Sequence, residues 1–297
     1  MKKPAVEKLL AAEKQNSVTT VPYLGVGVGL RRPYFSQFES QVPKVVHWVE
    51  VIAENYTPLK DGTLKKNRIE KLLKVREQVP VVLHSVSLSL GSTQKIDLQF
   101  LNHYKLLIDI IKPPWISDHL CFTNHHGIES HDLLPLPYTK ESLNTFVNKI
   151  DFLQSKFKVP FLVENVSSYL EFKDSEMEEW DFINQILKKS GCGLLLDINN
   201  VYVSSINHGF SAKHFLEKIN KHSIAQIHLA GHYNRGDILI DTHAESICDD
   251  VWTLYQDFIK TNGSFNTMIE RDDQFPPWSE IELDLKKVEK ILKNAKK

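Results

Sequence analysis

Carboxylate and imidazole side chains gather near the end of the chain in a spacing that suits metal binding. Asp241 and His243 are separated by one residue, His228 precedes them and Glu270 follows. In an extended segment, residues two apart point to the same face, so a carboxylate oxygen of Asp241 and an imidazole nitrogen of His243 can share one cation. One such pair is weak evidence, because a metal needs further ligands.

Other ionisable side chains stand at the ends of apolar, strand-like runs. A lone strand-end carboxylate more often caps a helix or pairs with a lysine, and a lone histidine is more often a core or surface residue. Six successive runs that end this way are not explained by core packing, since a buried charge is costly unless it is paired or bound to a metal. The joint pattern predicts a metal site built from His84, Asp118, Glu164, Asp197, Asn200, His228, Asp241, His243 and Glu270.

The donor types limit the metal. The set is too large for one cation, and structural zinc usually takes four ligands that include thiolates, whereas no cysteine stands at these strand ends. A mixed oxygen and nitrogen set suits iron, manganese or catalytic zinc. A bridging carboxylate, for which Glu164 is the best placed, would let two or three metals lie close together.

The elements that must position these residues alternate between strand and helix. Eight runs rich in valine, isoleucine and leucine are typical of a parallel sheet buried on both faces. They cover residues 24–30, 46–52, 79–88, 115–122, 159–166, 193–200, 224–231 and 265–271. Helical periodicity is found between them over residues 68–77, 98–111, 140–156, 178–189, 211–220 and 247–261. Eight repeats favour an α/β fold of the closed (β/α)8 TIM barrel class, in which all these strand ends converge on one mouth.

The remaining segments are assigned around this barrel. Residues 1–20 are expected to be an N-terminal extension with a short helix over 4–15, and residues 21–297 a single TIM-barrel catalytic domain. Residues 125–137 and 199–209 are expected to be long loops at the C-terminal face, where lids commonly form.

Composition excludes several classes of protein. Hydrophobic residues make up 42% of the chain and charged residues 25%, which are ordinary globular values. The net charge of −1 argues against a surface that neutralises many phosphates, so no nucleic acid partner is expected. The start of the chain lacks the apolar stretch of a signal peptide or membrane span. Three cysteines without a C-x-x-C pair fit a reducing cytoplasm.

A few other residues near the predicted mouth have open roles. Arg31 after the first strand, and Glu54 and Asn55 after the second, either bind substrate or close the rim with hydrogen bonds. His119 and His232 are ligands, supporting partners of ligands, or proton carriers. Seven further histidines are assigned to core or surface positions: His47, His103, His125, His126, His131, His214 and His222. The three alternate glycines of residues 25–29 lack the spacing of a phosphate loop and suit a crowded barrel interior.

The ordered motifs of the chain resemble the multinuclear non-heme iron-dependent oxidative enzymes (MNIO), the family typified by the methanobactin biosynthesis enzyme MbnB. The resemblance spans residues 24–270. It is carried by Gly27-Val-Gly29-Leu30-Arg31, Glu54-Asn55-Tyr56, His84-Ser85-Val86-Ser87-Leu88, Ser117-Asp118-His119-Leu120, Glu164-Asn165, Leu196-Asp197-Ile198-Asn199-Asn200-Val201-Tyr202-Val203, His228-Leu229-Ala230-Gly231-His232, Asp241-Thr242-His243 and Glu270-Arg271-Asp272.

The ligand order also resembles the trinuclear zinc barrels of the endonuclease IV type, within the xylose-isomerase-like barrels. By that order, His84 and Asp118 with Glu164 would hold a first metal. Glu164, Asp197, His228 and Glu270 would hold a second, and Asn200, Asp241 and His243 a third. The chain departs from the zinc enzymes at Asp118 or His119 and at Asn200, where a histidine is expected.

The family resemblance implies a function and its cofactors. It implies two or three iron ions of mixed Fe(II) and Fe(III) state, with O2 as co-substrate, that oxidise a ribosomally made precursor peptide at cysteine. It also implies a separately encoded partner protein that binds the leader peptide, and therefore a heterodimer. Three alternatives remain: a zinc-dependent abasic-site endonuclease, a divalent-metal sugar isomerase on the same barrel, and a non-catalytic binding module.

Overall fold

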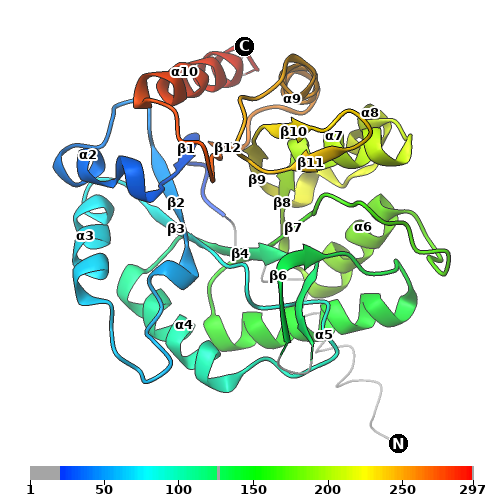
Figure 1. Ribbon diagram of the computed structural model, residues 1–297, viewed down its shortest axis with the longest axis horizontal. Helices are drawn as coiled ribbons and strands as arrows, with labels where there is room; N and C mark the ends of the chain where they lie inside the picture. Colours follow the sequence, from blue (N-terminus) through cyan, green and yellow to red (C-terminus); the bar gives the residue numbers. More distant parts are fainter. Residues whose placement is uncertain (1–20, 126–127, 296–297) are drawn as a thin grey trace, which may run out of the picture.

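Eight parallel strands close into a barrel in the computed structural model, which describes residues 21–125 and 128–295 (Figure 1). The strands are β1 (Val26–Gly29), β2 (Trp48–Ile52), β3 (Val81–His84), β4 (Ile116–His119), β7 (Phe161–Glu164), β8 (Gly193–Asp197), β9 (Ile224–Leu229) and β12 (Asn266–Ile269). Each lies inside one of the eight predicted runs, and β1 pairs with both β2 and β12 to close the ring. The predicted (β/α)8 barrel is therefore confirmed. The extension over residues 1–20, with its expected helix, lies outside the described residues.

Helices surround the barrel because each presents one apolar face to it. In α4 (Leu98–Ile111) the buried residues recur at three- and four-residue steps, as the sequence predicts. The other predicted helices are α3 (Lys66–Arg76), α5 (Lys140–Phe157), α6 (Glu179–Ser190), α8 (Ala212–Lys218) and α9 (Asp249–Asn262). The short α2 (Phe35–Ser40), the 3-10 turns η1 (Arg32–Tyr34), η2 (Ala53–Asn55) and η3 (Lys221–Ser223), and the last helix α10 (Trp278–Ala295) complete the ring.

The loop predicted over residues 199–209 is wrong, because that segment forms helix α7 (Ile198–His208). The Asp197 carboxylate accepts a hydrogen bond from the backbone N–H of Asn200 at 2.6 Å and caps the start of the helix. Gly209, with φ of 74°, ends it in the left-handed conformation. The sequence does not show an apolar helical pattern here because several of the buried residues are asparagines and serines, although the cap residues Asp197 and Gly209 are visible in it.

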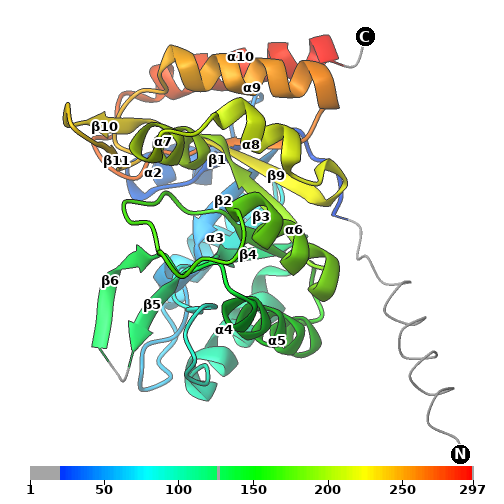
Figure 2. The same cartoon turned by 90° about the vertical axis from the view of Figure 1, so that its right-hand side faces the viewer.

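The loop predicted over residues 125–137 is also wrong for most of its length. A hairpin of β5 (Phe122–His125) and β6 (Ile128–Leu134) occupies it, and a second hairpin, β10 (His232–Asn234) and β11 (Leu239–Asp241), follows β9. Both hairpins project from the same side of the molecule in Figure 2. That side is the carboxyl end of the barrel strands, where β4 and β9 lead into them.

The floor of the barrel is filled by two indole rings. Trp48 and Trp115 are fully buried with ring centroids 5.3 Å apart, and the Trp48 indole N–H donates to the carbonyl of Gly25. Gly27 leaves room for this ring, since a Cβ there would lie 2.3 Å from the Trp48 indole. The alternate glycines thus serve packing, which agrees with the sequence-based interpretation.

Replacing Gly27 by alanine is expected to destabilise the fold by about 1–3 kcal/mol, the usual cost of overpacking a rigid core. Chemical denaturation would measure the free energy of unfolding. Equal stability of Gly27→Ala and the parent protein would contradict this packing role.

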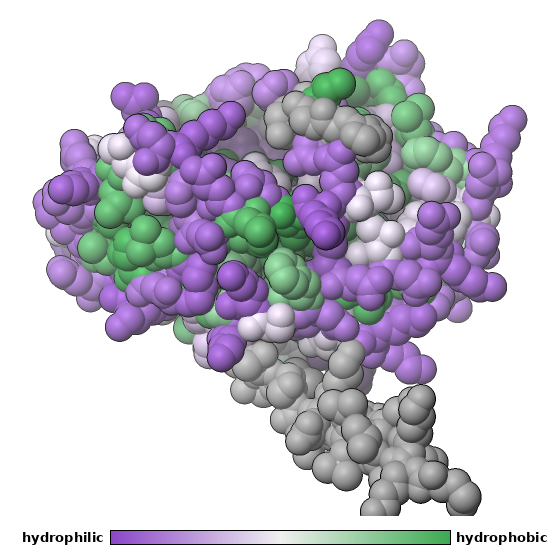
Figure 3. Space-filling model, turned by 90° about the horizontal axis from the view of Figure 1, so that it is seen from below, coloured by the Kyte–Doolittle hydropathy of each residue, from purple (hydrophilic) through white to green (hydrophobic). Residues whose placement is uncertain are grey.

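Among the described residues, no helix combines the length and the apolar character needed to cross a membrane. The face shown in Figure 3 is mostly hydrophilic, with hydrophobic side chains in small separate clusters.

Candidate metal centre

A cavity of about 610 Å³ opens at the carboxyl end of the barrel strands. Its lining includes His84, His119, His131, Asp241, His243, Glu270 and Asp272. The predicted ionisable residues meet here because each lies at or just beyond the carboxyl end of a barrel strand or in the loop that follows it, and parallel strands place these ends at one mouth.

One group of donors consists of His84, His119 and Glu164. The Nε2 atoms of the two histidines lie 3.3 Å apart, and they are 3.4 Å and 3.3 Å from Glu164 Oε2. Donors bound at about 2.0–2.1 Å to one cation lie roughly 3.0–3.4 Å apart, so these spacings suit a shared metal. His119 therefore occupies the position for which the sequence left Asp118 and His119 open.

Asp118 has a different environment from the one predicted for a ligand. Its Oδ1 accepts the backbone N–H of His119 at 2.6 Å, and its Oδ2 accepts that of Leu88 at 3.0 Å. Both oxygens are thus engaged by the backbone, and the side chain fixes the segment after β3 to the end of β4.

A second group consists of Glu164, Asp197, His228 and Glu270, all buried, in the combination expected from the sequence. His228 Nδ1 lies 3.2 Å from Glu164 Oε1, 3.0 Å from Glu270 Oε2 and 4.0 Å from Asp197 Oδ2. Glu164 therefore directs one carboxylate oxygen to each of the two groups. This is the arrangement that a bridging ligand between two neighbouring metals requires.

A third group surrounds His243 and includes the predicted Asp241 together with Glu270 and Asp272. His243 Nδ1 lies 3.3 Å from Glu270 Oε2 and 3.6 Å from Asp272 Oδ2, while its Nε2 is 2.8 Å from Asp241 Oδ1. Asp241 and His243 meet because His243 adopts a left-handed φ of 49° after β11 ends, and not by strand alternation. The Asn200 amide N–H donates to the carbonyl of Asn165, and its Oδ1 is buried without a hydrogen bond.

The chemistry of these groups fits a bound cation. Several buried donor atoms lie close to one another but lack the geometry of a hydrogen bond within the described chain: Glu164 Oε2, Asp197 Oδ2, His228 Nδ1 and His243 Nε2. An unpartnered buried polar atom is costly, and a carboxylate and imidazole cluster that leaves such atoms facing one another is stabilised when a metal binds them. The described residues can thus hold a metal at these positions.

The three predicted substrate-binding residues have distinct surroundings. The buried Arg31 guanidinium donates to Glu270 and Asp272, both at 2.7 Å, and so holds Glu270 in place. Glu54 Oε1 accepts from the Ser85 hydroxyl and the Val86 backbone, which ties η2 to the end of β3. Asn55 is exposed and lines a neighbouring cavity.

His232 lies beside the donor groups and not within them. The Asn199 amide oxygen is 2.8 Å from His232 Nδ1, so Nδ1 carries the proton and the lone pair is left on Nε2. Burial lowers the pKa of His232, which keeps the ring neutral near pH 7. This state is the one that accepts a proton.

Three residues were missed as parts of this site. Glu50 is completely buried in the middle of β2 and lies 3.2 Å from His228 Nε2, and a charged residue inside an apolar strand was a usable signal. Asp272 follows Glu270 with one residue between, so its spacing was also visible. His131, which had been assigned to the core or surface, lines the mouth cavity, because the hairpin that places it there was not predicted.

Burial and neighbouring charges shift several pKa values in this cluster. Burial alone would raise the pKa of Glu164, but the histidines, His228 foremost, outweigh it and hold the pKa at about 2. Burial raises the pKa of Asp197 to about 8, despite the opposing charge of His243. Burial would lower the pKa of His119, but the charge of Glu164 prevails and raises it to about 9. A metal must therefore displace protons to bind.

These shifts predict that the metal-free protein loses stability as the pH rises from 7 to 9. His119 and Asp197 both bind protons more tightly in the folded state than in the unfolded state. Their contribution to the free energy of unfolding is therefore lost as the pH rises through about 9 for His119 and about 8 for Asp197. Glu164 changes the pH dependence of stability only below its pKa in the unfolded state, which is about 4.3, and so has no effect between pH 7 and 9. Differential scanning calorimetry should show a falling Tm for metal-free protein and a smaller fall once metal is added. An equal pH dependence of both forms would contradict the prediction.

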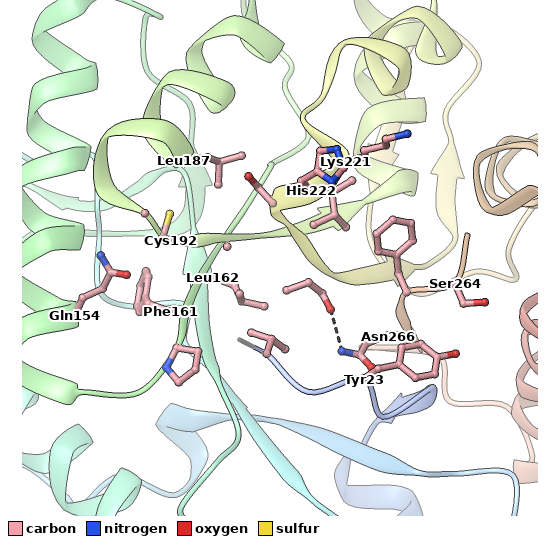
Figure 4. Close-up of a pocket in the computed structure, with 18 residues that line it drawn as sticks. Tyr23, Gln154, Phe161, Leu162, Leu187, Cys192, Lys221, His222, Ser264 and Asn266 are labelled. Carbon is pink, nitrogen blue, oxygen red and sulfur yellow. Dashed lines mark hydrogen bonds between the residues drawn. The ribbon is translucent and has the colours of Figure 1, made fainter. Parts of the chain in front are cut away.

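Another cavity, of about 470 Å³, lies at the opposite end of the barrel (Figure 4). It is lined at the starts of β7, β8, β9 and β12 by residues such as Phe161, Leu162, Cys192 and Asn266. Burial raises the pKa of the Cys192 thiol to about 12, so it is not a reactive thiolate. This end of the barrel provides no cluster comparable to that of the mouth among the described residues.

Fold and site together define a (β/α)8 barrel with a candidate multinuclear metal centre at its mouth. The chain belongs to the family of RiPP precursor modification enzymes MbnB/TglH/ChrH, whose model matches residues 25–293. RiPPs are ribosomally synthesised and post-translationally modified peptides. The family resemblance seen in the sequence is thus confirmed.

Several curated relatives agree with this assignment. A UPF0276 protein of Rhizorhabdus wittichii is 44% identical over 270 residues, which cover 91% of this chain and 95% of the relative. A UPF0276 protein of Anaeromyxobacter is 46% identical and covers 86% of this chain and 88% of the relative.

Similar solved structures show the fold alone. Endonuclease IV from Thermus thermophilus has a TM-score of 0.57 at 11% identity, over 92% of this chain and 100% of that one. A putative xylose isomerase from Rhodospirillum rubrum has a TM-score of 0.58 at 13% identity, over 92% and 98%. The barrel is therefore of the xylose-isomerase-like and endonuclease IV-like type.

Proposed function

We propose that the protein uses two or three iron ions and O2 to oxidise cysteine residues of a ribosomally made precursor peptide. The observation that carries the proposal is Glu164, whose two oxygens face different donor groups on either side of it. Membership of a family of precursor-modifying enzymes supports the peptide substrate. Mixed oxygen and nitrogen donors without a cysteine support iron over structural zinc.

The residues of the mouth would form separate sets of ligands for each iron. His84, His119 and Glu164 would hold one iron, and Glu164, Asp197, His228 and Glu270 the next. A third would lie at His243, with Asp241 and Asn200 as predicted or with Glu270 and Asp272 on the other ring nitrogen. Bound iron supplies a Lewis acid for a substrate thiolate and a redox centre for O2.

Protons released from the substrate need an acceptor near the metals. His232 is proposed for this role, since its neutral ring keeps the Nε2 lone pair and Asn199 fixes its orientation. Arg31 is proposed to position Glu270 through their 2.7 Å ion pair. His119 is proposed as a metal ligand and not as a proton carrier, because its Nε2 lies in the group with His84 and Glu164.

A separately encoded partner that binds the leader peptide is also proposed, by extension of the family resemblance, with a heterodimer as the working form in the cytoplasm. The three free cysteines are compatible with that reducing compartment. Co-expression with the neighbouring reading frames and co-purification would test the partner.

Purification without oxygen, followed by metal analysis and electron paramagnetic resonance, tests the proposed cofactor. We expect at least two irons per chain and O2 uptake on addition of the cysteine-containing peptide encoded beside the gene. The same peptide with serine in place of cysteine is the control and should cause no uptake. Protein that contains zinc alone and consumes no O2 with the cysteine peptide would refute the proposal.

A further inference from the structure

A second cavity, of about 520 Å³, lies beside the mouth between η1, α2, η2 and α3. We call it the basic pocket, and its lining includes Arg32, Phe35, Ile52, Asn55, Tyr56, Arg68 and Lys71. Ile52 also lines the mouth cavity, so the two cavities are neighbours. Arg31 connects them as well, since it lines the basic pocket and its guanidinium donates to Glu270.

The lining of the basic pocket carries positive charge only. It contains four cationic side chains and no aspartate or glutamate. Arg31 is neutralised by Glu270 and Asp272, and Lys71 pairs with Glu39 at 3.1 Å. Within the described chain, Arg32 and Arg68 form no ion pair, so their charges remain uncompensated. Against a net charge of −1 for the whole chain, this is a marked local excess.

Neutral groups hold these cations in place. Arg68 donates to the backbone carbonyl of Asn55 at 3.2 Å, and Lys65, which lies outside the lining, donates to that of Glu54 at 2.8 Å. A carbonyl orients a cation without cancelling its charge. Burial lowers the pKa of Lys65, and the charge of Arg68 acts in the same direction, while the charge of Glu54 opposes both. An anion in the basic pocket would compensate the charges of Arg32 and Arg68, which both line it.

The other lining residues indicate which class of anion the basic pocket would bind. Phe35 and Ile52 supply apolar surface, while Asn55, Asn67 and Tyr56 add hydrogen-bonding groups to the same lining as Arg68. Guanidinium groups bind planar carboxylates with paired hydrogen bonds. A volume of about 520 Å³ suits one or two residues of a peptide rather than an extended polymer.

We propose that the basic pocket binds a carboxylate of the precursor peptide and so anchors the peptide beside the metal centre. That the carboxylate belongs to a peptide rests on the proposed function, whereas binding of the carboxylate itself needs neither iron nor O2. The carboxylate belongs to an acidic side chain or to the peptide C-terminus, and the experiment distinguishes the two.

Titration of the protein with three small probes, followed by NMR of the arginine Nε–H groups, tests the proposal. N-acetyl-glutamate amide carries a side-chain carboxylate, N-acetylglycine carries a terminal one, and N-acetyl-glutamine amide is the neutral control. At least one acid should bind and shift the Arg68 resonance, and the acid that binds more tightly identifies the source. The neutral amide should not bind.

Variants separate the basic pocket from other anion sites. Arg68→Ala should weaken binding of the acid by about tenfold or more, because a hydrogen bond to a charged group is lost. Lys74→Ala is the matched control, as Lys74 lies on the same helix outside the lining and is 62% exposed. Metal content should be unchanged in both variants.

Three results would overturn the proposal: equal binding of the acids and the neutral amide, undiminished binding by Arg68→Ala, or Arg68-dependent binding of a single-stranded oligonucleotide with none of the acids. A protein that lacks iron but binds the acids through Arg68 would refute the proposed oxidation and leave the basic pocket standing.

Discussion

Replacing Glu164 by alanine is expected to remove metal from both central positions and to abolish activity. Its two oxygens lie 3.3 Å from His119 Nε2 and 3.2 Å from His228 Nδ1, so each donor group loses a member at once. Loss of a residue that merely supports a ligand costs about 10–100-fold in metal affinity or activity, and loss of a shared ligand should exceed this. Metal analysis after dialysis would measure the change.

Two further variants sharpen this prediction. Glu164→Gln keeps a single carbonyl oxygen and is expected to retain metal in at most one of the two groups. Glu289→Ala is the matched control, because Glu289 lies on α10 and, among the described residues, pairs only with Lys293 on the surface. Full metal content in Glu164→Ala would show that this residue bridges no metals.

The barrel and much of its mouth could be predicted because they depend on local patterns. A continuous apolar run indicates a strand buried on both faces, and its last residue, such as Glu164 or Asp197, must lie at the mouth if all strands are parallel. The choice of Glu164 as the bridging residue followed from its place in the middle of the series.

The rest of the mouth depends on structure between the strands. Helix α7 was missed because Asp197 serves both as a strand end and as a helix cap, and the polar residues that follow resemble a loop. The hairpin that carries His131 to the mouth has weak strand patterning. Whether Asp118 or His119 faces the metals is decided by backbone N–H groups that occupy both oxygens of Asp118, which sequence spacing does not reveal.

Glu50 lies below the metal donors and influences which nitrogen of His228 carries the proton. The Trp115 indole donates to Gln226 Oε1 at 2.6 Å, so the Gln226 amide presents its N–H groups to Glu50 Oε2 and His228 Nε2, both at 2.7 Å. Glu50 Oε1 lies 3.2 Å from the same His228 nitrogen and has no other partner. His228 Nε2 can therefore donate to Glu50 or accept from Gln226.

The charge of Glu50 decides between these two states. A carboxylate is the stronger partner, and with the proton on Nε2 the Nδ1 atom is free to bind metal. In Glu50→Gln the shape is kept but the charge is lost, and the amide donors favour a proton on Nδ1, which blocks that atom. We expect a fall in metal affinity of about 10–100-fold at the group of Glu164, Asp197, His228 and Glu270.

Competition with a chelator would measure this affinity in Glu50→Gln, and electron paramagnetic resonance would show whether the environment of the remaining metal changes. Glu282→Gln on the surface of α10 is the control for loss of one charge, since Lys286 is the only partner of Glu282 in the described part of the chain. The group at His84 and His119 shares no hydrogen bond with Glu50, so its metal should remain. Glutamine and glutamate side chains have the same size, so Glu50→Gln is expected to keep the fold. Unchanged metal affinity at His228 would mean that Gln226, and not Glu50, determines which nitrogen of this ring carries the proton.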